Sequence, residues 1–194
     1  MVAELGELKL NHMIEFKKVI IPDEVDALCE FDRRAFHVYP NDVYDAEDWK
    51  ELESYWMIVD GETVGCTAFD HNIDYDDRPR PGCLYISSTS VLPEFQGQGF
   101  GKKQKEWQIE YAKQNGFQVI VTNMRQSNER IIGLNERFGF QRRKTVPGYY
   151  ADPREPAVVM ELDLQKLPTP CPRCGKPLRT PRAKQCRFCL ADWH

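Results

Sequence analysis

The stretch "FQGQGFGKK", residues Phe95 to Lys103, decides the fold because glycine stands at every second position, at Gly97, Gly99 and Gly101, before two lysines. Glycine adopts positive φ at little cost and lets another molecule approach the backbone closely. A loop of this kind between a predicted strand and a predicted helix exposes N–H groups at a helix N-terminus, where anions bind. The stretch therefore predicts an anion-binding turn.

This turn fits neither of two common phosphate-binding patterns. The loop of NTPases needs four residues between its glycines and then Lys-Ser or Lys-Thr, whereas Gly97 and Gly101 enclose three residues and two lysines follow. The dinucleotide pattern GxGxxG needs a glycine at position 102 or 104, where Lys102 and Gln104 stand, and an early βαβ unit. What remains is a match of residues 96–101 to the pattern Q/R-x-x-G-x-G/A.

Composition indicates a globular chain. Of the 194 residues, 41% are hydrophobic and 29% charged, and no apolar run approaches the roughly 20 residues that a membrane helix needs. The first residues carry acids where a secretory signal carries basic residues, so we expect a cytoplasmic protein with no membrane partner.

The order of predicted elements indicates a mixed α/β sheet with helices packed on its faces. Asp60-Gly61 between two apolar runs predicts a hairpin, and residues 70–82 read as a loop because they are rich in acids and turn formers. One strand, without defined bounds, is expected between the last predicted helix and the last predicted strand. The remaining strands are expected at 13–19, 55–59, 63–69, 83–91, 117–123 and 157–164, and the helices at 22–36, 46–53, 102–115 and 130–137.

Residues 14–164 resemble the GNAT superfamily of N-acetyltransferases, which holds the pyrophosphate of acetyl-CoA on a loop like that at 96–101. Downstream, "SNERIIGLNERFGF" resembles the family's second motif. The resemblance implies a GNAT-type mixed, mostly antiparallel central sheet flanked by helices, and an acyltransferase that uses acetyl-CoA. It places the cofactor contacts at Thr89, Ser90, Val91, Gln96, Gly97, Gln98, Gly99, Phe100, Gly101, Lys102 and Asn128.

Within the superfamily the chain looks most like the ribosomal-protein and amino-terminal acetyltransferases. "AFHVYPNDVYDAEDW" (35–49) resembles their loop over the acceptor peptide, and "VPGYYADPREPAVVMEL" (146–162) resembles their paired tyrosines and the following strand. Tyr39, Tyr149 and Tyr150 would then contact the acceptor. The alternative is that such residues are only amphipathic side chains at a sheet edge.

The family's acid–base residues do not carry over. A tyrosine, Tyr85, stands where histone-type members carry a glutamate base, and Asn123 and Asn135 stand where ribosomal-type members carry a glutamate and a tyrosine acid. An asparagine cannot exchange a proton near neutral pH, so Asn123 would at most orient a water molecule. We expect Tyr85, Tyr149 or Tyr150 to donate the proton. The alternative is an adaptor that binds acyl-CoA without catalysis.

The acids of the predicted loop at 70–82 allow two interpretations. They would attract a cationic primary amine, such as a protein or peptide amine, a polyamine or an aminoglycoside, with Asp70 as a substrate contact. The alternative is an ordinary solvated loop, which would leave Asp74, Asp76 and Asp77 without a role.

The last 24 residues hold a strong metal-binding signal. Two C-x2-C pairs separated by 11 residues predict a zinc ribbon whose ligands are Cys171, Cys174, Cys186 and Cys189. Iron is the alternative metal for four thiolates, and thioredoxin-like redox chemistry is disfavoured because it uses one pair at a βα junction. We therefore expect an acetyltransferase domain at 1–165 and a linker with the zinc ribbon at 166–194.

The two expected parts differ in charge. Residues 165–194 carry a formal charge of +6, and the remainder carries −10. A basic tail leaves weak nucleic-acid binding open, although the tail has few aromatic side chains for stacking on bases. Docking to a partner protein and a homodimer contact are the other interpretations.

Overall fold

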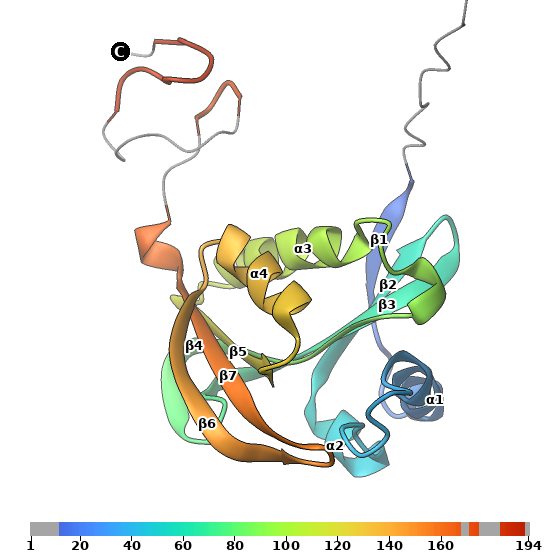
Figure 1. Ribbon diagram of the computed structural model, residues 1–194. Coiled ribbons are helices and arrows are strands. Elements are labelled where there is room, and N and C mark those ends of the chain that lie inside the picture. The colour runs from blue at the N-terminus through green and yellow to red at the C-terminus, as the bar shows by residue number, and fades with distance from the viewer. Residues whose placement is uncertain (1–11, 168–170, 175–182, 193–194) are drawn as a thin grey trace, which may run out of the picture.

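The computed structural model describes residues 12–167, 171–174 and 183–192. One seven-stranded sheet, in the order β1-β2-β3-β4-β5-β7-β6, forms the centre (Figure 1). All neighbouring strands pair antiparallel except β4 and β5, which pair parallel. The strands are β1 (Ile14–Lys18), β2 (Glu53–Val59), β3 (Glu62–Ile73), β4 (Pro79–Val91), β5 (Val119–Arg125), β6 (Gln141–Ala151) and β7 (Arg154–Asp163).

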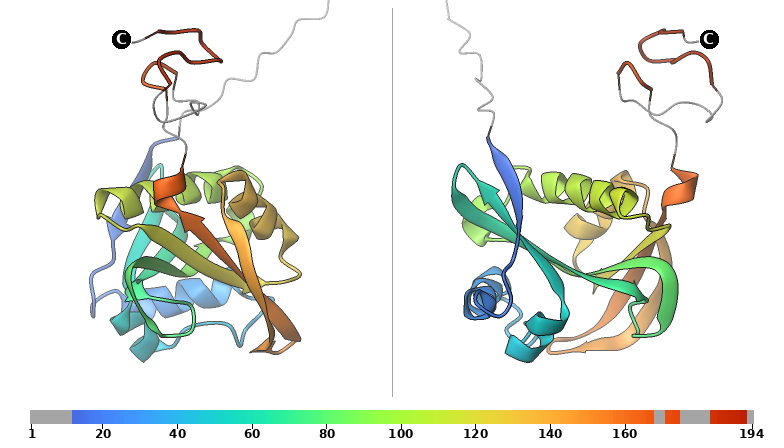
Figure 2. Two further views of the ribbon diagram at one scale, coloured as in Figure 1. Left: turned by 90° about the vertical axis from the view of Figure 1, so that its left-hand side faces the viewer. Right: turned by 180° about the vertical axis from the view of Figure 1, so that it is seen from behind.

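Helices cover both faces of this sheet. α1 (Val25–Ala35) and α2 (Ala46–Glu51) lie on one face, and α3 (Phe100–Gln114) and α4 (Glu129–Arg137) lie on the other (Figure 2). Short 3-10 turns follow β4 and β7, at Pro93–Phe95 and Leu164–Lys166. None of the described helices combines the length and hydrophobicity needed to cross a bilayer.

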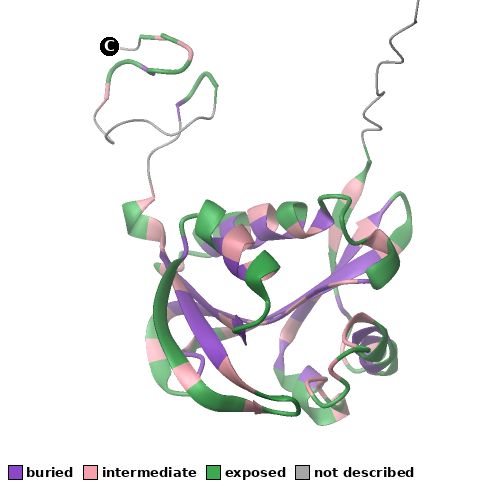
Figure 3. Cartoon of the chain, viewed as in Figure 1, coloured by how far each residue is buried: buried purple, intermediate pink, exposed green. Residues whose placement is uncertain are grey.

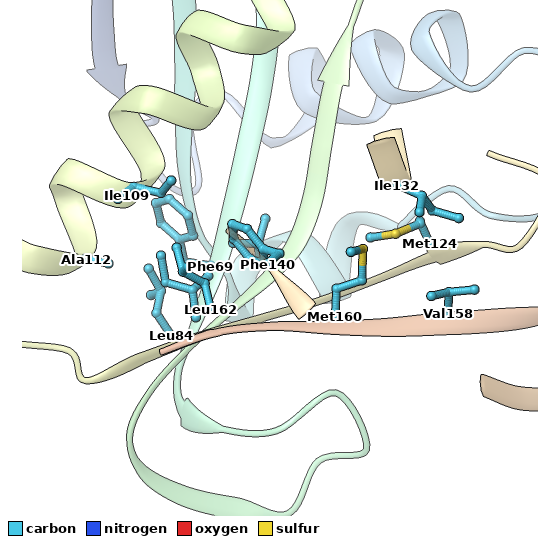
Figure 4. Close-up of a cluster of buried hydrophobic side chains, with 12 residues drawn as sticks. Phe69, Leu84, Ile109, Ala112, Met124, Ile132, Phe140, Val158, Met160 and Leu162 are labelled. Carbon is cyan, nitrogen blue, oxygen red and sulfur yellow. The ribbon is translucent and has the colours of Figure 1, made fainter. Parts of the chain in front are cut away.

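The strands carry apolar side chains on both faces because helices cover both. Leu84 and Ile86 of β4 face α3 and α4, and they join the buried cluster that contains Phe69 and Met160 (Figure 4). Successive residues of a strand point to opposite faces, so the neighbouring Tyr85 faces the other way. Burial is concentrated in the central strands, whereas most of β6 is exposed (Figure 3).

The predicted hairpin at Asp60-Gly61 and the α/β architecture are confirmed. The loop predicted at 70–82 is wrong at both ends, because β3 continues to Ile73 and β4 begins at Pro79. The ladder extends through these polar residues because their partners belong to the apolar strand β4, with Asp70 opposite Tyr85. Pairing along a long hairpin thus overrides local composition. The second helix is also shorter than predicted, since Glu53 already belongs to β2.

Two acids of that hairpin end, Asp74 and Asp76, are paired with arginines. Asp74 is 4% exposed, and its carboxylate accepts hydrogen bonds from Arg143 at 2.6 Å and from Arg80 at 3.4 Å. Asp76 pairs with Arg78. The interpretation of a solvated loop is therefore wrong for Asp74, which joins the β3–β4 hairpin to β6.

A second buried acid belongs to the buried side of α1. Asp32 is 1% exposed, and its carboxylate accepts the backbone N–H of Tyr44 at 3.0 Å. Burial raises the pKa of Asp32 to about 6, and the hydrogen bond from Tyr44 offsets only part of this shift. The carboxylate joins α1 to the segment that leads into α2, at the cost of a charge held away from water.

We predict that Asp32→Asn stabilises the protein more at pH 7 than at pH 4. Because the pKa of Asp32 is raised in the folded state, its contribution to the free energy of unfolding is fully present below its unfolded pKa. This contribution is lost as the pH rises through about 6. Asn keeps an oxygen for Tyr44 without the charge. The gain of the variant over wild type should grow by up to about 3 kcal/mol between the two pH values. Urea unfolding measures it, Asp26→Asn on the exposed side of α1 is the control, and a gain independent of pH would contradict the prediction.

Candidate functional site

The site begins where β4 and β5 separate. Their parallel pairing runs from Cys83 opposite Val119 to Ile86 opposite Thr122 and then stops. Beyond this point β4 stays paired with β3 as far as Val91, and β5 stays paired with β7 as far as Arg125. Each strand therefore has an inner edge without a strand partner, and the two diverge (Figure 1). Unpaired backbone groups on such edges can bind a ligand.

The glycine loop lies just beyond the end of β4. Gly97 and Gly99 have φ of +83° and +92°, and a side chain on either would meet open space. α3 begins at Phe100 with Gly99 at its N-cap and no side-chain cap, so Phe100, Gly101 and Lys102 form its first turn. No backbone group that the structure describes accepts a hydrogen bond from the N–H groups of residues 97–101. They are available to an anion at the positive end of α3.

The side chains around the loop mostly serve the fold. Gln96 and Gln98 donate to the carbonyls of Val91 and Glu94. Thr89 Oγ1 accepts from Gln108 at 2.8 Å. Two further predicted cofactor contacts also have partners within the chain: Ser90 donates to the carbonyl of Cys66, and Asn128 caps α4 by accepting from the N–H of Ile131. Apart from the exposed ammonium groups of Lys102 and Lys103, which pair with Glu106, contact of this region with an anion therefore depends on main-chain groups.

Four of the predicted site residues meet at the point where the strands separate. The Tyr85 hydroxyl, from β4, donates a short hydrogen bond to Oδ1 of Asn123 in β5, and Asn123 Nδ2 donates to the hydroxyl of Tyr150 in β6 at 3.3 Å. The side chain of Tyr149 also contacts Tyr85 and Asn123. Residues far apart in the sequence thus form one polar cluster, which we call the tyrosine cluster: Tyr85, Asn123, Tyr149 and Tyr150.

The tyrosines of the cluster are weaker acids than a tyrosine in water. Tyr85 is 7% exposed, and burial raises its pKa well above the usual value; burial also raises the pKa of Tyr149 and of Tyr150. They can donate protons in hydrogen bonds but are unsuited to accept one as bases. Because Tyr150 accepts from Asn123, its own hydroxyl proton can point toward another group.

Two residues beside the cluster complete this side of the sheet. Asp70 lies in β3 directly opposite Tyr85, not in a loop as expected, and burial raises the pKa of its carboxyl. Tyr44 donates from its hydroxyl to the carbonyl of Ser87, the first residue of β4 beyond its pairing with β5. Sequence reasoning missed Tyr44. Its position in the segment 35–49, from which only Tyr39 was selected, was the available signal.

Tyr39 and Asn135 lie outside the tyrosine cluster. The ring of Tyr39 packs on the guanidinium of Arg125, with 4.3 Å between Cζ and the ring centroid. Asn135 belongs to the buried side of α4, and its amide contacts the sulfur atoms of Met124 and Met160. These methionines belong to the core under α3 and α4, on the face opposite Tyr85.

The four cysteines predicted as ligands are gathered together. All four Sγ atoms lie within 4.8 Å of one another, and the pairs Cys171–Cys189 and Cys174–Cys186 are 3.7 and 3.6 Å apart. A tetrahedron with metal–sulfur bonds of about 2.3 Å has edges of about 3.8 Å, so the spacing suits one zinc ion. Backbone N–H groups of Arg173 and Phe188 point at two of the sulfurs, an arrangement that favours thiolates.

Comparison with known proteins shows which family this chain is similar to. The family model described as "Acetyltransferase (GNAT) family" matches residues 25–140. An uncharacterised N-acetyltransferase of Methanocaldococcus jannaschii is 25% identical over 141 residues, which cover 67% of this chain but only 62% of that relative. This chain therefore spans less than two thirds of that curated relative.

Solved structures share the fold. The ribosomal-protein-S18-alanine N-acetyltransferase from Escherichia coli superimposes with a TM-score of 0.64 at 19% identity, over 78% of this chain and 94% of that one. A Bacillus subtilis acetyltransferase solved in complex with CoA has a TM-score of 0.59 at 20% identity, over 79% of this chain and 99% of the other. At these identities the likeness establishes the fold alone.

We predict that Gly99→Ala destabilises the protein and that Gly101→Ala does not. Gly99 has φ of +92°, so alanine there should lower the free energy of unfolding by about 1 kcal/mol through backbone strain. Gly101 lies in the first helical turn, and its added Cβ meets only Leu134 at 4.0 Å, so alanine should be neutral or stabilising there. Urea unfolding of both variants measures the difference, and equal effects would contradict the prediction.

Proposed function

The chain belongs to the acetyltransferase (GNAT) family, and from that premise we propose that it transfers an acetyl group from acetyl-CoA to a primary amine. The observation that carries the proposal is the arrangement along β4. The tyrosine cluster begins at Tyr85, an edge unpaired with β5 runs from Ser87 to Val91, and the glycine loop follows. Five residues of strand span about 17 Å, room for an extended linear group between the loop and the cluster.

In this proposal the main chain holds the cofactor. The diphosphate accepts hydrogen bonds from the N–H groups that residues 97–101 present at the start of α3, whereas the N–H of Lys102 donates to the carbonyl of Gly99. The pantetheine arm bonds to the free edge of Thr89, Ser90 and Val91. Asn128 lies at the N-cap of α4, on the other side of the separated strands, where it would contact the cofactor. Contacts of this kind tolerate side-chain changes because they use backbone groups.

The proposed chemistry is direct attack of the amine on the thioester. The amine nitrogen bonds to the carbonyl carbon, the carbon–sulfur bond breaks, and the leaving thiolate takes a proton from Tyr150. Asn123 supports this role because its amide donates to the Tyr150 oxygen and leaves the tyrosine proton free. Tyr85 fixes Asn123 by donating to its carbonyl oxygen. The proton lost by the amine passes to water or to the nearby carboxylate of Asp70, and water returns a proton to Tyr150, so that the enzyme is restored.

Negative charge beside the tyrosine cluster supports a cationic acceptor. Asp70 lies opposite Tyr85, and the carboxylates of Asp42 and Glu155 share the single guanidinium of Arg125. Such surroundings attract an ammonium group. Tyr39, Tyr149 and Tyr150 border the same region, and a protein or peptide amine is the favoured acceptor, with a polyamine or an aminoglycoside as the alternatives.

We predict that the protein releases CoA thiol from acetyl-CoA with at least one of four amines: a peptide with a free N-terminal alanine, an N-terminally blocked lysine peptide, spermidine, or kanamycin. Tyr150→Phe should lower kcat about 100-fold, because it removes the proton donor but keeps the ring. Tyr111→Phe, whose hydroxyl bonds to Glu53 away from the site, is the control. Binding of acetyl-CoA without turnover on any amine would instead favour an adaptor that binds acyl-CoA.

The proposal includes a zinc ion held by Cys171, Cys174, Cys186 and Cys189. The sulfur spacing and the two N–H groups directed at sulfur support it. Zinc would supply a structural cross-link there, since four thiolates leave no open position for chemistry. Residues 166–194 would then form a separate linker and ribbon, in a compartment such as the cytoplasm that keeps thiols reduced.

We predict about one zinc per chain by elemental analysis of the purified protein. Cys186→Ser should lose most of this zinc, because a hydroxyl is a poor replacement for a thiolate ligand. Cys29→Ser, which changes a buried cysteine of α1, should retain it. Equal zinc contents in the two variants would argue against the four-cysteine site, and iron in its place would identify the alternative metal.

A further inference from the structure

A buried guanidinium lies at the end of β5. Arg125 is 4% exposed, and it makes five hydrogen bonds, the number of N–H donors that an arginine side chain has. Nε and Nη2 bind the two carboxylate oxygens of Asp42 at 2.7 and 2.8 Å. The remaining donors bind Glu155 and the carbonyls of Asp152 and Pro153.

These partners come from two segments that are distant in the sequence. Asp42 precedes α2, whereas Asp152 and Pro153 form the turn between β6 and β7 and Glu155 lies at the start of β7. We call residues 39–42 and 149–155 the two acceptor segments, since the proposed function places both beside the amine. Asn41 adds a direct bond between them by donating to the Asp152 carboxylate at 2.9 Å.

The same guanidinium contacts one tyrosine from each segment. The ring centroids of Tyr39 and Tyr150 both lie 4.3 Å from Arg125 Cζ. Cation–π contact with two rings holds both in place, and it requires the flat, delocalised charge of arginine. Tyr150 is also the ring whose hydroxyl belongs to the tyrosine cluster.

Binding of a ligand anion by Arg125 is excluded by its hydrogen bonds. All of its donors are occupied by groups of the chain itself, and its charge is already balanced by Asp42 and Glu155. Removing one partner would leave a buried charge uncompensated, so the arrangement resists rearrangement. Its effect is therefore on the position of its neighbours.

We propose that Arg125 is a positioning residue that joins the two acceptor segments and fixes Tyr39 and Tyr150 for the acceptor amine. This inference rests on the proposed function for its consequence in catalysis, but the joining of the segments is independent of it. Lysine cannot replace arginine here, since one ammonium group has three donors and no flat face for the rings.

Hydrogen exchange of the intact protein tests the joining directly. In Arg125→Lys, amides of residues 39–44 and 149–155 should exchange about tenfold faster, and both segments should respond together. Arg143→Lys is the matched control, because Arg143 also pairs with buried and half-buried carboxylates, of Asp74 and Glu161, but connects no acceptor segment. Exchange in α3 should be the same in both variants.

Steady-state kinetics tests the consequence for binding of the amine. The substrate is an amine, from the four named above, that the wild-type protein acetylates. Arg125→Lys should raise KM for the amine about tenfold and leave KM for acetyl-CoA within about twofold, because the glycine loop is untouched. Tyr39→Leu, which removes one ring and keeps the buried charge pair, should raise KM for the amine in the same direction.

Two results would overturn the inference. One is unchanged exchange in either acceptor segment of Arg125→Lys. The other is faster exchange without a selective rise in KM for the amine, including an equal rise in both KM values. If wild type acetylates no amine, the proposed function fails, and the exchange measurement alone then decides whether Arg125 joins the segments.

Discussion

The separation of β4 from β5 is the constraint on which the rest of the structure depends. The two parallel strands stay paired for only four residue pairs, but each keeps its other neighbour, β3 or β7, to its end. The sheet therefore divides into two halves without losing its outer ladders. A strand edge without a partner is costly inside a protein unless another group satisfies it. The glycine loop, the tyrosine cluster and the acceptor segments all lie along this opening.

Charge and burial differ along the opening between β4 and β5. At the glycine loop the main chain supplies partial positive charge, and none of the first-turn residues of α3 is an acid. At the tyrosine cluster burial raises the pKa of the hydroxyls. Beyond it, two carboxylates share one guanidinium and leave an excess of negative charge. An anionic cofactor would thus meet partial positive charge at the glycine loop, and a cationic acceptor would meet negative charge beside the tyrosine cluster.

The errors of the sequence reasoning have a common physical cause. Residues 70–82 resemble a loop because acids and prolines are poor strand formers, yet the ladder with β4 holds most of them extended. Asp74 resembles a solvated acid, but Arg143, 69 positions away, neutralises it. Arg125 gave no local signal and Tyr44 only its position in the segment 35–49, since the importance of both comes from partners in other elements. Each case depends on a contact between distant segments.

The sequence by itself determined the α/β architecture, the glycine turn before α3 and the four clustered cysteines. These follow from short patterns, because positive φ at Gly97 and Gly99 and the C-x2-C spacing are properties of neighbouring residues. Only the tertiary structure decided which polar side chains meet at Tyr85 and what joins residues 39–42 to residues 149–155. Those answers depend on hydrogen bonds between β4, β5 and β6 and on a guanidinium that contacts two distant segments, and no local pattern encodes such distances.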